Sequence, residues 1–411
     1  MPRRILLITQ WFDPEPTSKG LVFARELVRR GFEVEVLTGF PNYPGGKLYA
    51  GYKVRLVQRE VRDGVQVTRV ALYPSHDQSG LRRTCNYLSF AATAAVYSLF
   101  FAKRPDVIYA YHPPLTVGIV AALTRLIRRV PAVLDIQDLW PDTLRATGML
   151  ANTWALALAG KICSLVYGGV DHVVVLSPGF KRMLVSRGVP DQRIDVIHNW
   201  CDEVALQASD ERLPENFPTS DRFRVVFAGN MGKAQALDAV LEAAVLLRGA
   251  APEVSLVFVG GGVEVGRLRD LARTKELRNV VFVPHVPMAE IGAVLRNAEA
   301  LLVHLRKDPL FGITIPSKTQ AYMAVGKPIV MAVSGDAASL IEESGCGIVA
   351  ESENPASIAA AIVTLSRAER PALEGMGMSG RKFYEEHLCL RVGVTRFARI
   401  FDQVAARKAG E

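Results

Sequence analysis

Two successive series of strand and helix patterns divide the sequence, and this division constrains the fold more than any other feature. Short apolar runs, of which Ile5–Thr9 is the first, alternate with amphipathic stretches such as Lys19–Arg30. Strands that are apolar at every position are typical of parallel strands covered on both faces, and strand–helix order predicts a doubly wound α/β sheet. After a polar segment that contains Pro214 and Pro218, the alternation restarts at Arg224–Ala228.

The restart predicts two Rossmann-like α/β domains that face a cleft. We expect the domains to cover residues 1–205 and 222–388, with a linker at 206–221 and a C-terminal helix near 389–407 that packs back on the first domain. Ligands of such sheets bind beyond the carboxyl ends of the strands and at domain boundaries. The residues that follow each predicted strand are therefore the candidates for function.

Composition narrows the class of protein. Hydrophobic residues make up 49% of the 411 residues, which excludes a disordered chain. The five cysteines are scattered without a C-x-x-C pair, which excludes a disulfide scaffold and a cysteine-rich zinc module and fits a reducing cytoplasm. The N-terminus begins with a strand after two arginines, so we do not interpret it as a signal peptide.

The positive charge is confined to the first half. Residues 1–205 contain 25 Lys and Arg against 17 Asp and Glu, whereas the remainder contains 24 of each. The excess indicates an anionic partner such as a membrane, nucleic acid or polyphosphate, or else serves solubility alone. The basic residues are dispersed and lack an interleaved aromatic series, so we expect no nucleic-acid binding.

Several common signatures are missing. No G-x-x-x-x-G-K-[ST] loop occurs and no G-x-G-x-x-G follows the first strand, which weakens ATPase and dehydrogenase interpretations. No D-x-D pair and no His/Cys cluster with zinc spacing is present, so we predict no metal site.

The strand ends of the second half carry glycines and lysines. The loop from Gly229 to Gln235 includes Lys233 and precedes a helix, whose N-terminal amides and positive dipole suit a diphosphate; the alternative is an ordinary strand–helix turn. Gly260–Gly262 either clears space for a nucleobase or forms a turn. Ser317 and Lys318 begin another helix, where a cation opposes the dipole unless an anion binds there; the alternative is a solvated lysine.

The strand ends of the first half carry groups suited to catalysis. His112 ends one predicted strand, and Asp138, Trp140 and Asp142 follow the next. A histidine and carboxylates at this edge are candidate catalytic groups, although each also has a structural interpretation as a core histidine or a loop-bracing carboxylate. Lys19 and Gly20 open the first helix and are expected to face the cleft.

Motifs in this order resemble family 4 glycosyltransferases of the GT-B fold, and most closely the bacterial O-antigen, capsule and colanic-acid type, including fucosamine transferases. The motifs are His112-Pro113, Gln137-Asp138-Leu139-Trp140-Pro141-Asp142, Val196–Asp202, Gly229–Gln235 and Ala321–Pro328. The resemblance implies a retaining, metal-independent enzyme without a cofactor. Its donor is expected to be a nucleotide-sugar, with UDP as the nucleotide and GDP as the alternative, and an N-acetylated aminosugar is one candidate for the sugar that this enzyme transfers.

The resemblance also implies residue roles and partners. The second half is expected to bind the donor and the first half the acceptor, a saccharide on a polyprenyl diphosphate at the cytoplasmic face of the inner membrane. The expected catalytic residues are His112, near the anomeric carbon, and Asp138; the expected acceptor-binding residues are Lys19, Trp140 and Asp142; the expected donor-binding residues are Gly20, Gly229, Asn230, Lys233, Gln235, Gly262, Ser317 and Lys318.

The sequence departs from the family pattern in two places. Asn230 and Gln235 occupy positions where the family has Arg and Lys, so Lys233 is expected to supply the charge. No E-x7-E pair occurs between Leu305 and Gly326, and Ala321 stands where its second glutamate would align. Two other functions therefore stay open, a UDP-sugar 2-epimerase and a catalytically degenerate scaffold of an assembly complex.

One uncharged stretch suggests membrane contact. Residues 84–102 carry no charge and are flanked by Arg82-Arg83 and Lys103-Arg104. Its polar and small residues make it a poor membrane span, so we predict a helix in the membrane interface whose basic flanks meet anionic head groups. The alternative is a helix buried against the sheet.

Overall fold

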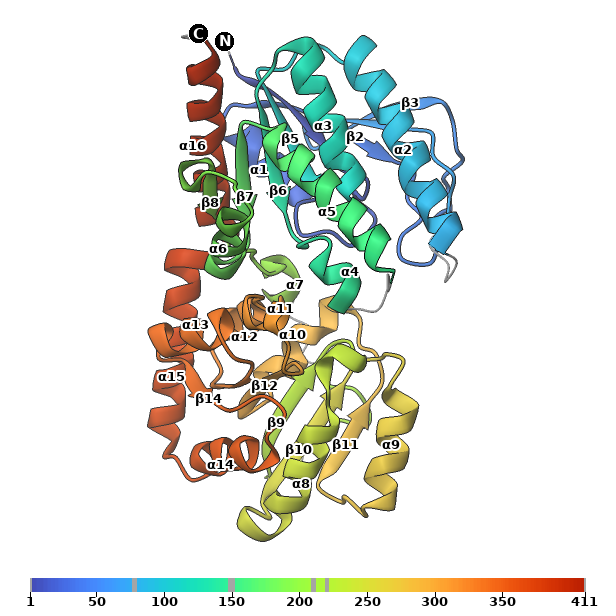
Figure 1. Cartoon of the computed structure of the whole chain (residues 1–411). Helices are drawn as coiled ribbons and strands as arrows, with labels where there is room; N and C mark the ends of the chain where they lie inside the picture. The colour runs from blue at the N-terminus through green and yellow to red at the C-terminus, as the bar shows by residue number, and fades with distance from the viewer. Residues whose placement is uncertain (1, 76–79, 147–151, 208–211, 219–221, 410–411) are drawn as a thin grey trace. The chain divides into compact units, whose positions relative to one another are not determined.

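The structure is a computed structural model that describes residues 2–75, 80–146, 152–207, 212–218 and 222–409. The chain forms two compact units (Figure 1). The first unit consists of Met1–His198 together with Gly393–Glu411, and the second consists of Asn199–Val392. Each unit is built on its own sheet, so the predicted pair of α/β folds is confirmed.

The first unit contains an eight-stranded sheet with the order β3-β4-β2-β1-β5-β6-β7-β8. All neighbouring strands are parallel except β3, which pairs antiparallel with β4. The strands are β1 (Arg4–Ile8), β2 (Glu33–Gly39), β3 (Val57–Arg62), β4 (Val65–Val70), β5 (Val107–His112), β6 (Ala132–Ile136), β7 (His172–Val175) and β8 (Ile194–Val196). The central strands β1, β5 and β6 are almost wholly buried, as their continuous apolar sequences predict.

Strand β3 was not predicted from the sequence. It lies at the sheet edge, and exposed and partly buried residues alternate along it, including Arg59, Glu60 and Arg62. Charged side chains on an edge strand prevent pairing with other chains, and they also remove the apolar signal by which we recognise strands.

Helices cover both faces of the first sheet. Helices α1 and α16 share one face, where Phe397 of α16 packs on Phe23 of α1 and on Tyr109 of β5. Helices α2, α3 and α5 lie side by side on the other face (Figure 1). The helices of this unit are α1 (Leu21–Arg29), α2 (Gly80–Phe100), α3 (Leu115–Arg128), α4 (Asp142–Ala146), α5 (Thr153–Gly168), α6 (Pro178–Ser186), the 3₁₀ turn η1 (Asp191–Arg193) and most of α16 (Leu390–Ala409).

The second unit contains a parallel six-stranded sheet with the order β11-β10-β9-β12-β13-β14. Its strands are β9 (Phe223–Ala228), β10 (Val254–Val259), β11 (Val280–Val283), β12 (Ala300–His304), β13 (Ile329–Ala332) and β14 (Gly347–Val349). Its helices are α7 (Glu203–Gln207), η2 (Lys233–Gln235), α8 (Asp238–Ala250), α9 (Val265–Thr274), α10 (Met288–Arg296), α11 (Pro309–Gly312), α12 (Lys318–Val325), α13 (Asp336–Ser344), α14 (Pro355–Ser366), α15 (Arg370–Phe383) and the π-helical turn η3 (Tyr384–Leu388). Helices α8, α9 and α14 form one core with the sheet, and α10, α12 and α13 form another.

The second unit begins earlier than the expected boundary at residue 205. Helix α7 packs on α10, where the Arg296 Nη1 donates to the Leu206 carbonyl at 2.6 Å and Gly292 lets the two backbones approach. Phe217, within the expected linker, is buried in the same core. The described parts of that linker therefore belong to the second unit, while residues 208–211 and 219–221 lie outside the described residues.

Helix α2 includes the uncharged stretch 84–102 up to Phe100, and the structure shows a helix with two different sides. On one side of α2, Asn86, Phe90 and Tyr97 are buried. On the other side, Leu88 and Phe100 are exposed. Among the described residues, no helix combines the length and apolar character needed to cross a bilayer.

Candidate active site

Three glycines bring two loops of the second unit into close contact. After β9, Gly229 has φ +130, and after β10, Gly260 and Gly262 have φ +134 and +145, all in the region that favours glycine. A Cβ atom on Gly260 would lie 2.2 Å from the Gly229 carbonyl oxygen, and one on Gly262 would lie 2.4 Å from that of Met231. Packing between these loops therefore explains Gly260 and Gly262, so Gly262 need not contact a donor.

Lys318 places a buried ammonium beside the first of these loops. Its Nζ lies 3.4 Å from the centroid of the Phe227 ring, and a Cβ atom on Gly229 would lie 3.4 Å from it. The Nζ has no hydrogen-bond partner among the described residues. Burial lowers the pKa of Lys318 from 10.5 to about 7, because desolvation disfavours the charged form. Gly229 and Lys318, both predicted to bind the donor, therefore lie side by side.

Tyr322 fixes this geometry. The Ala228 N–H donates to the Tyr322 hydroxyl at 2.9 Å, which ties α12 to the end of β9. Tyr322 is fully buried and lies one helical turn after Lys318, so the lysine is held over Phe227. A buried amine that has no hydrogen-bond partner among the described residues is suited to bind an anionic ligand.

The other residues predicted to bind the donor differ in exposure and in their partners. Lys233 and Asn230 are exposed on the loop, and Lys233 lines a cavity of about 250 Å³ that also includes Arg267 and Arg306. The Gln235 side chain instead accepts a hydrogen bond from the Gly232 N–H at 2.9 Å, so it braces the loop. Ser317 is exposed, and its side chain does not cap α12.

The loop includes the 3₁₀ turn η2 at its end, and helix α8 begins at Asp238. Below the loop, the His304 Nδ1 hydrogen-bonds to the Gln235 carbonyl at 2.6 Å, and the Glu353 N–H donates to the His304 Nε2 at 3.1 Å. The ring is therefore a neutral tautomer protonated on Nδ1, and burial lowers its pKa.

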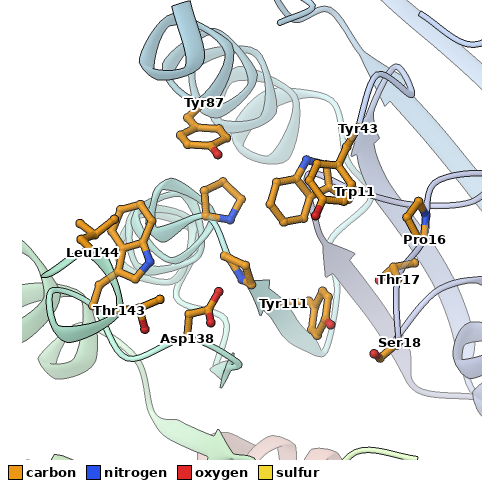
Figure 2. Close-up of a pocket in the computed structure, with 13 residues that line it drawn as sticks. Trp11, Pro16, Thr17, Ser18, Tyr43, Tyr87, Tyr111, Asp138, Thr143 and Leu144 are labelled. Carbon is orange, nitrogen blue, oxygen red and sulfur yellow. The ribbon is translucent and has the colours of Figure 1, made fainter. Parts of the chain in front are cut away.

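The first unit contains a pocket of about 330 Å³ at the carboxyl ends of its strands (Figure 2). Aromatic side chains dominate its wall and surround one carboxylate, that of Asp138. The lining residues with aromatic rings or polar side chains are Trp11, Thr17, Ser18, Tyr43, Tyr87, Tyr111, Asp138, Trp140 and Thr143. Aromatic faces with a few polar groups form a site suited to a sugar ring, whose C–H groups are apolar and whose hydroxyls need partners.

Trp11 and Tyr43 form a stacked platform on one side of this pocket. Their ring centroids lie 4.4 Å apart with an interplanar angle of 24°. Trp11 follows β1 and Tyr43 follows β2, so the platform depends on how these two loops are held together.

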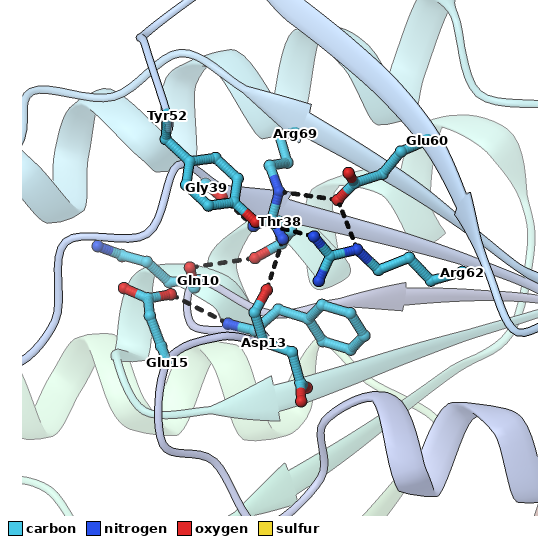
Figure 3. Close-up of polar contacts among 10 residues, drawn as sticks. Gln10, Asp13, Glu15, Thr38, Gly39, Tyr52, Glu60, Arg62 and Arg69 are labelled. Atoms are coloured by element: carbon cyan, nitrogen blue, oxygen red, sulfur yellow. Dashed lines mark hydrogen bonds and ion pairs between the residues drawn. The ribbon is translucent and has the colours of Figure 1, made fainter. Parts of the chain in front are cut away.

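Two buried charged residues hold the loops (Figure 3). The Glu15 carboxylate accepts hydrogen bonds from the N–H groups of Phe12, Asn42 and Tyr43, and its pKa is raised because its burial outweighs these bonds. The Arg69 guanidinium donates to the carbonyls of Asp13 and Gly39. These contacts bind the loop after β1 to the loop after β2 and position the platform.

The predicted catalytic pair lies at the ends of neighbouring strands. Asp138 lines the pocket, and desolvation by burial raises its pKa. His112 is fully buried at the end of β5, and its ring meets that of Trp140 edge-on at 5.9 Å. Neither ring nitrogen of His112 has a partner among the described residues, and burial lowers its pKa to about 3, so the ring is neutral.

The structure contradicts three contacts predicted in this unit. Lys19 is fully buried and pairs with Asp135 at 3.2 Å, so no acceptor reaches it. Gly20 packs against Asp13. The Asp13 carboxylate accepts a hydrogen bond from the Leu21 N–H at 2.6 Å, so it occupies the N-terminus of α1 where a donor phosphate was expected. Asp142 forms an ion pair with Arg187 and does not line the pocket.

Trp140 is the one aromatic residue of this wall that was predicted from the sequence. Trp11 and Tyr43 lie in loops that follow strands, so the same search of strand ends would have found them. Tyr87 lies on a helix, and only the packing of α2 beside the pocket shows its position.

Two α/β units, one with a buried lysine beside a glycine loop and the other with an aromatic pocket at the carboxyl ends of its parallel strands, have the architecture of a GT-B glycosyltransferase. Residues 21–200 match the glycosyl transferase 4-like domain, and residues 209–383 match the glycosyl transferases group 1 domain. The chain belongs to this family of two-domain glycosyltransferases, and the predicted class of enzyme is confirmed.

Curated relatives are similar to this chain over most of its length. The chain is 27% identical to a putative colanic acid biosynthesis glycosyl transferase of Escherichia coli, over 79% of this chain and 81% of that protein. It is 26% identical to a probable glycosyltransferase of Pseudomonas aeruginosa, over 70% of this chain and 73% of that protein.

Solved structures with low sequence identity have the same fold. Sucrose-phosphate synthase from Thermosynechococcus elongatus superposes with a TM-score of 0.76 at 17% identity, covering 98% of this chain and all of that one. The Anabaena protein HepE in complex with UDP gives 0.69 at 16% identity, covering 97% of this chain and all of that one.

Proposed function

We propose that the enzyme transfers a sugar, with retention of configuration and without a metal, from a nucleoside diphosphate to a lipid-linked saccharide of a bacterial surface polysaccharide. The observation that carries the proposal is the buried Lys318 ammonium beside the Gly229 loop, which lacks a counter-ion among the described residues. A diphosphate supplies that charge. The UDP complexes of HepE and the colanic acid relative agree with this donor and this pathway class.

In the proposed reaction, an acceptor hydroxyl oxygen bonds to the anomeric carbon of the donor sugar on the face from which the diphosphate leaves. The bond from that carbon to the diphosphate oxygen breaks at the same time, so the configuration is retained. The developing negative charge stays on the nucleoside diphosphate, where Lys318 and Lys233 stabilise it. The hydroxyl proton passes to the Asp138 carboxylate, whose raised pKa makes it a better base than an ordinary aspartate. His112 is neutral and offers a ring nitrogen to the sugar or the diphosphate.

The acceptor sugar is proposed to bind in the aromatic pocket of the first unit. Its ring would stack on the Trp11–Tyr43 platform or on Trp140, with its hydroxyl oriented by Asp138. UDP is the expected leaving group, and GDP is the alternative.

A thermal-shift panel of UDP, GDP, TDP and their sugars tests the donor site. We expect one nucleotide to raise the Tm, and Lys233→Ala and Lys318→Met each to reduce that shift. If no nucleotide stabilises the protein, or if neither substitution changes the shift, the donor site is refuted.

Incubation with the selected nucleotide-sugar distinguishes the other functions. An epimerase would convert UDP-sugar without an acceptor, and a scaffold would bind nucleotide without turnover on any lipid-linked saccharide. We expect release of the nucleoside diphosphate that depends on an added acceptor.

A further inference from the structure

Helix α5 is apolar around its whole circumference, but the first unit buries only one side of it. Lys161 is its single charged residue. Only Cys163, Val166 and Tyr167 are buried, whereas Trp154 and Leu165 are 72% and 76% exposed. A helix that is apolar all round is normally covered by protein or lipid, so the exposed side of α5 needs a cover.

The neighbouring helices continue this exposed apolar surface. Helix α3 contacts α5 where Gly118 packs against Val166, and it contacts α2 through a 2.8 Å hydrogen bond between Thr124 and Ser98. The apolar face that we define consists of the exposed side chains of these three helices and of the residue after α2: Leu81, Leu88, Val96, Phe100, Phe101, Ile119, Leu123, Leu126, Ile127, Trp154, Leu158 and Leu165.

The charges on these helices have one sign. None of the three contains an aspartate or glutamate, although the chain has 41 acidic residues among 411. They carry Arg82, Arg83, Arg125, Arg128 and Lys161, of which Arg125 is paired with Asp171. Lys103 and Arg104 follow α2. An apolar surface with basic residues and no acidic ones is complementary to anionic head groups above an apolar layer.

We propose that the apolar face of α2, α3 and α5 docks the first unit on an anionic phospholipid bilayer, with Trp154, Phe100 and Leu165 inserted at the head-group boundary. The proposal extends the single predicted interfacial helix to a surface built from three. It rests on the proposed function for its purpose, since a lipid-linked acceptor is held in the same bilayer.

The acceptor pocket lies at the edge of this face. Tyr87 of α2 lines the pocket (Figure 2). The next residue, Leu88, belongs to the apolar face. Arg83, one turn earlier, can neutralise a lipid diphosphate there. A saccharide would thus enter the pocket while its lipid stays in the bilayer.

Vesicle co-sedimentation of the full chain tests the docking without nucleotide or acceptor. We expect binding to vesicles of phosphatidylglycerol mixed with phosphatidylethanolamine, and weaker binding to vesicles of phosphatidylcholine alone. Exchanging exposed side chains, as in Leu126→Asp with Leu165→Asp, or Phe100→Ser with Phe101→Ser, should lower the binding by roughly tenfold or more.

Val263→Asp is the matched control, because Val263 is 84% exposed in the second unit and lies outside the apolar face. It should leave vesicle binding unchanged. Circular dichroism and Tm should show that all variants are folded, because every exchanged side chain is exposed.

Three outcomes would overturn the proposal. The first is equal vesicle binding by the wild type and the folded variants, and the second is no vesicle binding by the wild type. The third is a stable dimer in ultracentrifugation that Leu126→Asp with Leu165→Asp dissociates, since a second copy would then cover the face.

A parallel activity assay separates this proposal from the proposed function. The folded variants should keep nucleotide binding and turnover of a short-chain, water-soluble acceptor, and lose turnover of the acceptor embedded in vesicles. Vesicle binding in the absence of any transferase activity would support docking while refuting the function.

Discussion

The Lys318 ammonium lies 3.4 Å from the centroid of the Phe227 ring, where the ring face supplies attraction but no hydrogen bond. The arrangement keeps the amine dry in the free protein. An anion that enters beside Gly229 would gain a charge-assisted contact that water does not screen.

Lys318→Met should weaken binding of the nucleoside diphosphate by about 10- to 100-fold, the range for a lost charged hydrogen bond. The Tm of the free protein should rise, because the buried ammonium has no hydrogen-bond partner to offset its desolvation. Calorimetric titration and thermal melts measure both effects. Unchanged affinity would remove Lys318 from the site.

The free protein should become more stable as pH rises above 7. The pKa of Lys318 is about 7 in the folded state and 10.5 as the ordinary value, so between these values the unfolded chain binds more protons. The free-energy cost of burying the charged form of this lysine is therefore fully present below pH 7 and disappears near pH 10.5. The difference in Tm between wild type and Lys318→Met should shrink over that window.

Nucleotide binding should take up a proton above pH 7. A bound diphosphate favours the charged lysine and raises its pKa, so affinity falls as pH rises above 7. Titrations of the selected nucleotide at pH 8, in buffers with different ionisation enthalpies, report the proton count. Lys318→Met should show no uptake, and equal uptake in the variant would assign the proton elsewhere.

Asp138→Asn should lower turnover by about 100-fold or more with little change in nucleotide affinity, as expected for a general base. In the wild type, activity should fall as pH drops through the raised pKa of this carboxyl, because protonation removes the base. The pH–rate profile of the wild type shows this limb. An active variant with the same limb would contradict the assignment.

Asp135→Asn should destabilise the first unit by about 3–5 kcal/mol, because Lys19 would stay buried without its carboxylate. The Tyr109 hydroxyl, which donates to Asp135 at 2.6 Å, would also lose a charged partner. Denaturant unfolding measures the change. A loss below 1 kcal/mol would show that water reaches Lys19.

The sequence was sufficient for the order of most strands and helices, because continuous apolar strands and amphipathic helices have distinct periods. It also named Gly229 and Lys318 as donor-binding residues, and the structure places the two side by side. It failed for Lys19, Gly20 and Asp142, because a strand-end position does not tell whether a side chain faces a ligand or an internal partner. Asp135, which pairs with Lys19, lies inside a strand that reads as apolar.

The return of α16 to the first unit has a consequence for synthesis. Phe397 and Phe401 pack on Tyr109 in the middle of a sheet whose strands are all translated before residue 199. The face of that sheet on which α16 packs therefore lacks this helix until the whole second unit has been translated. The first unit to be translated is thus the last to be complete.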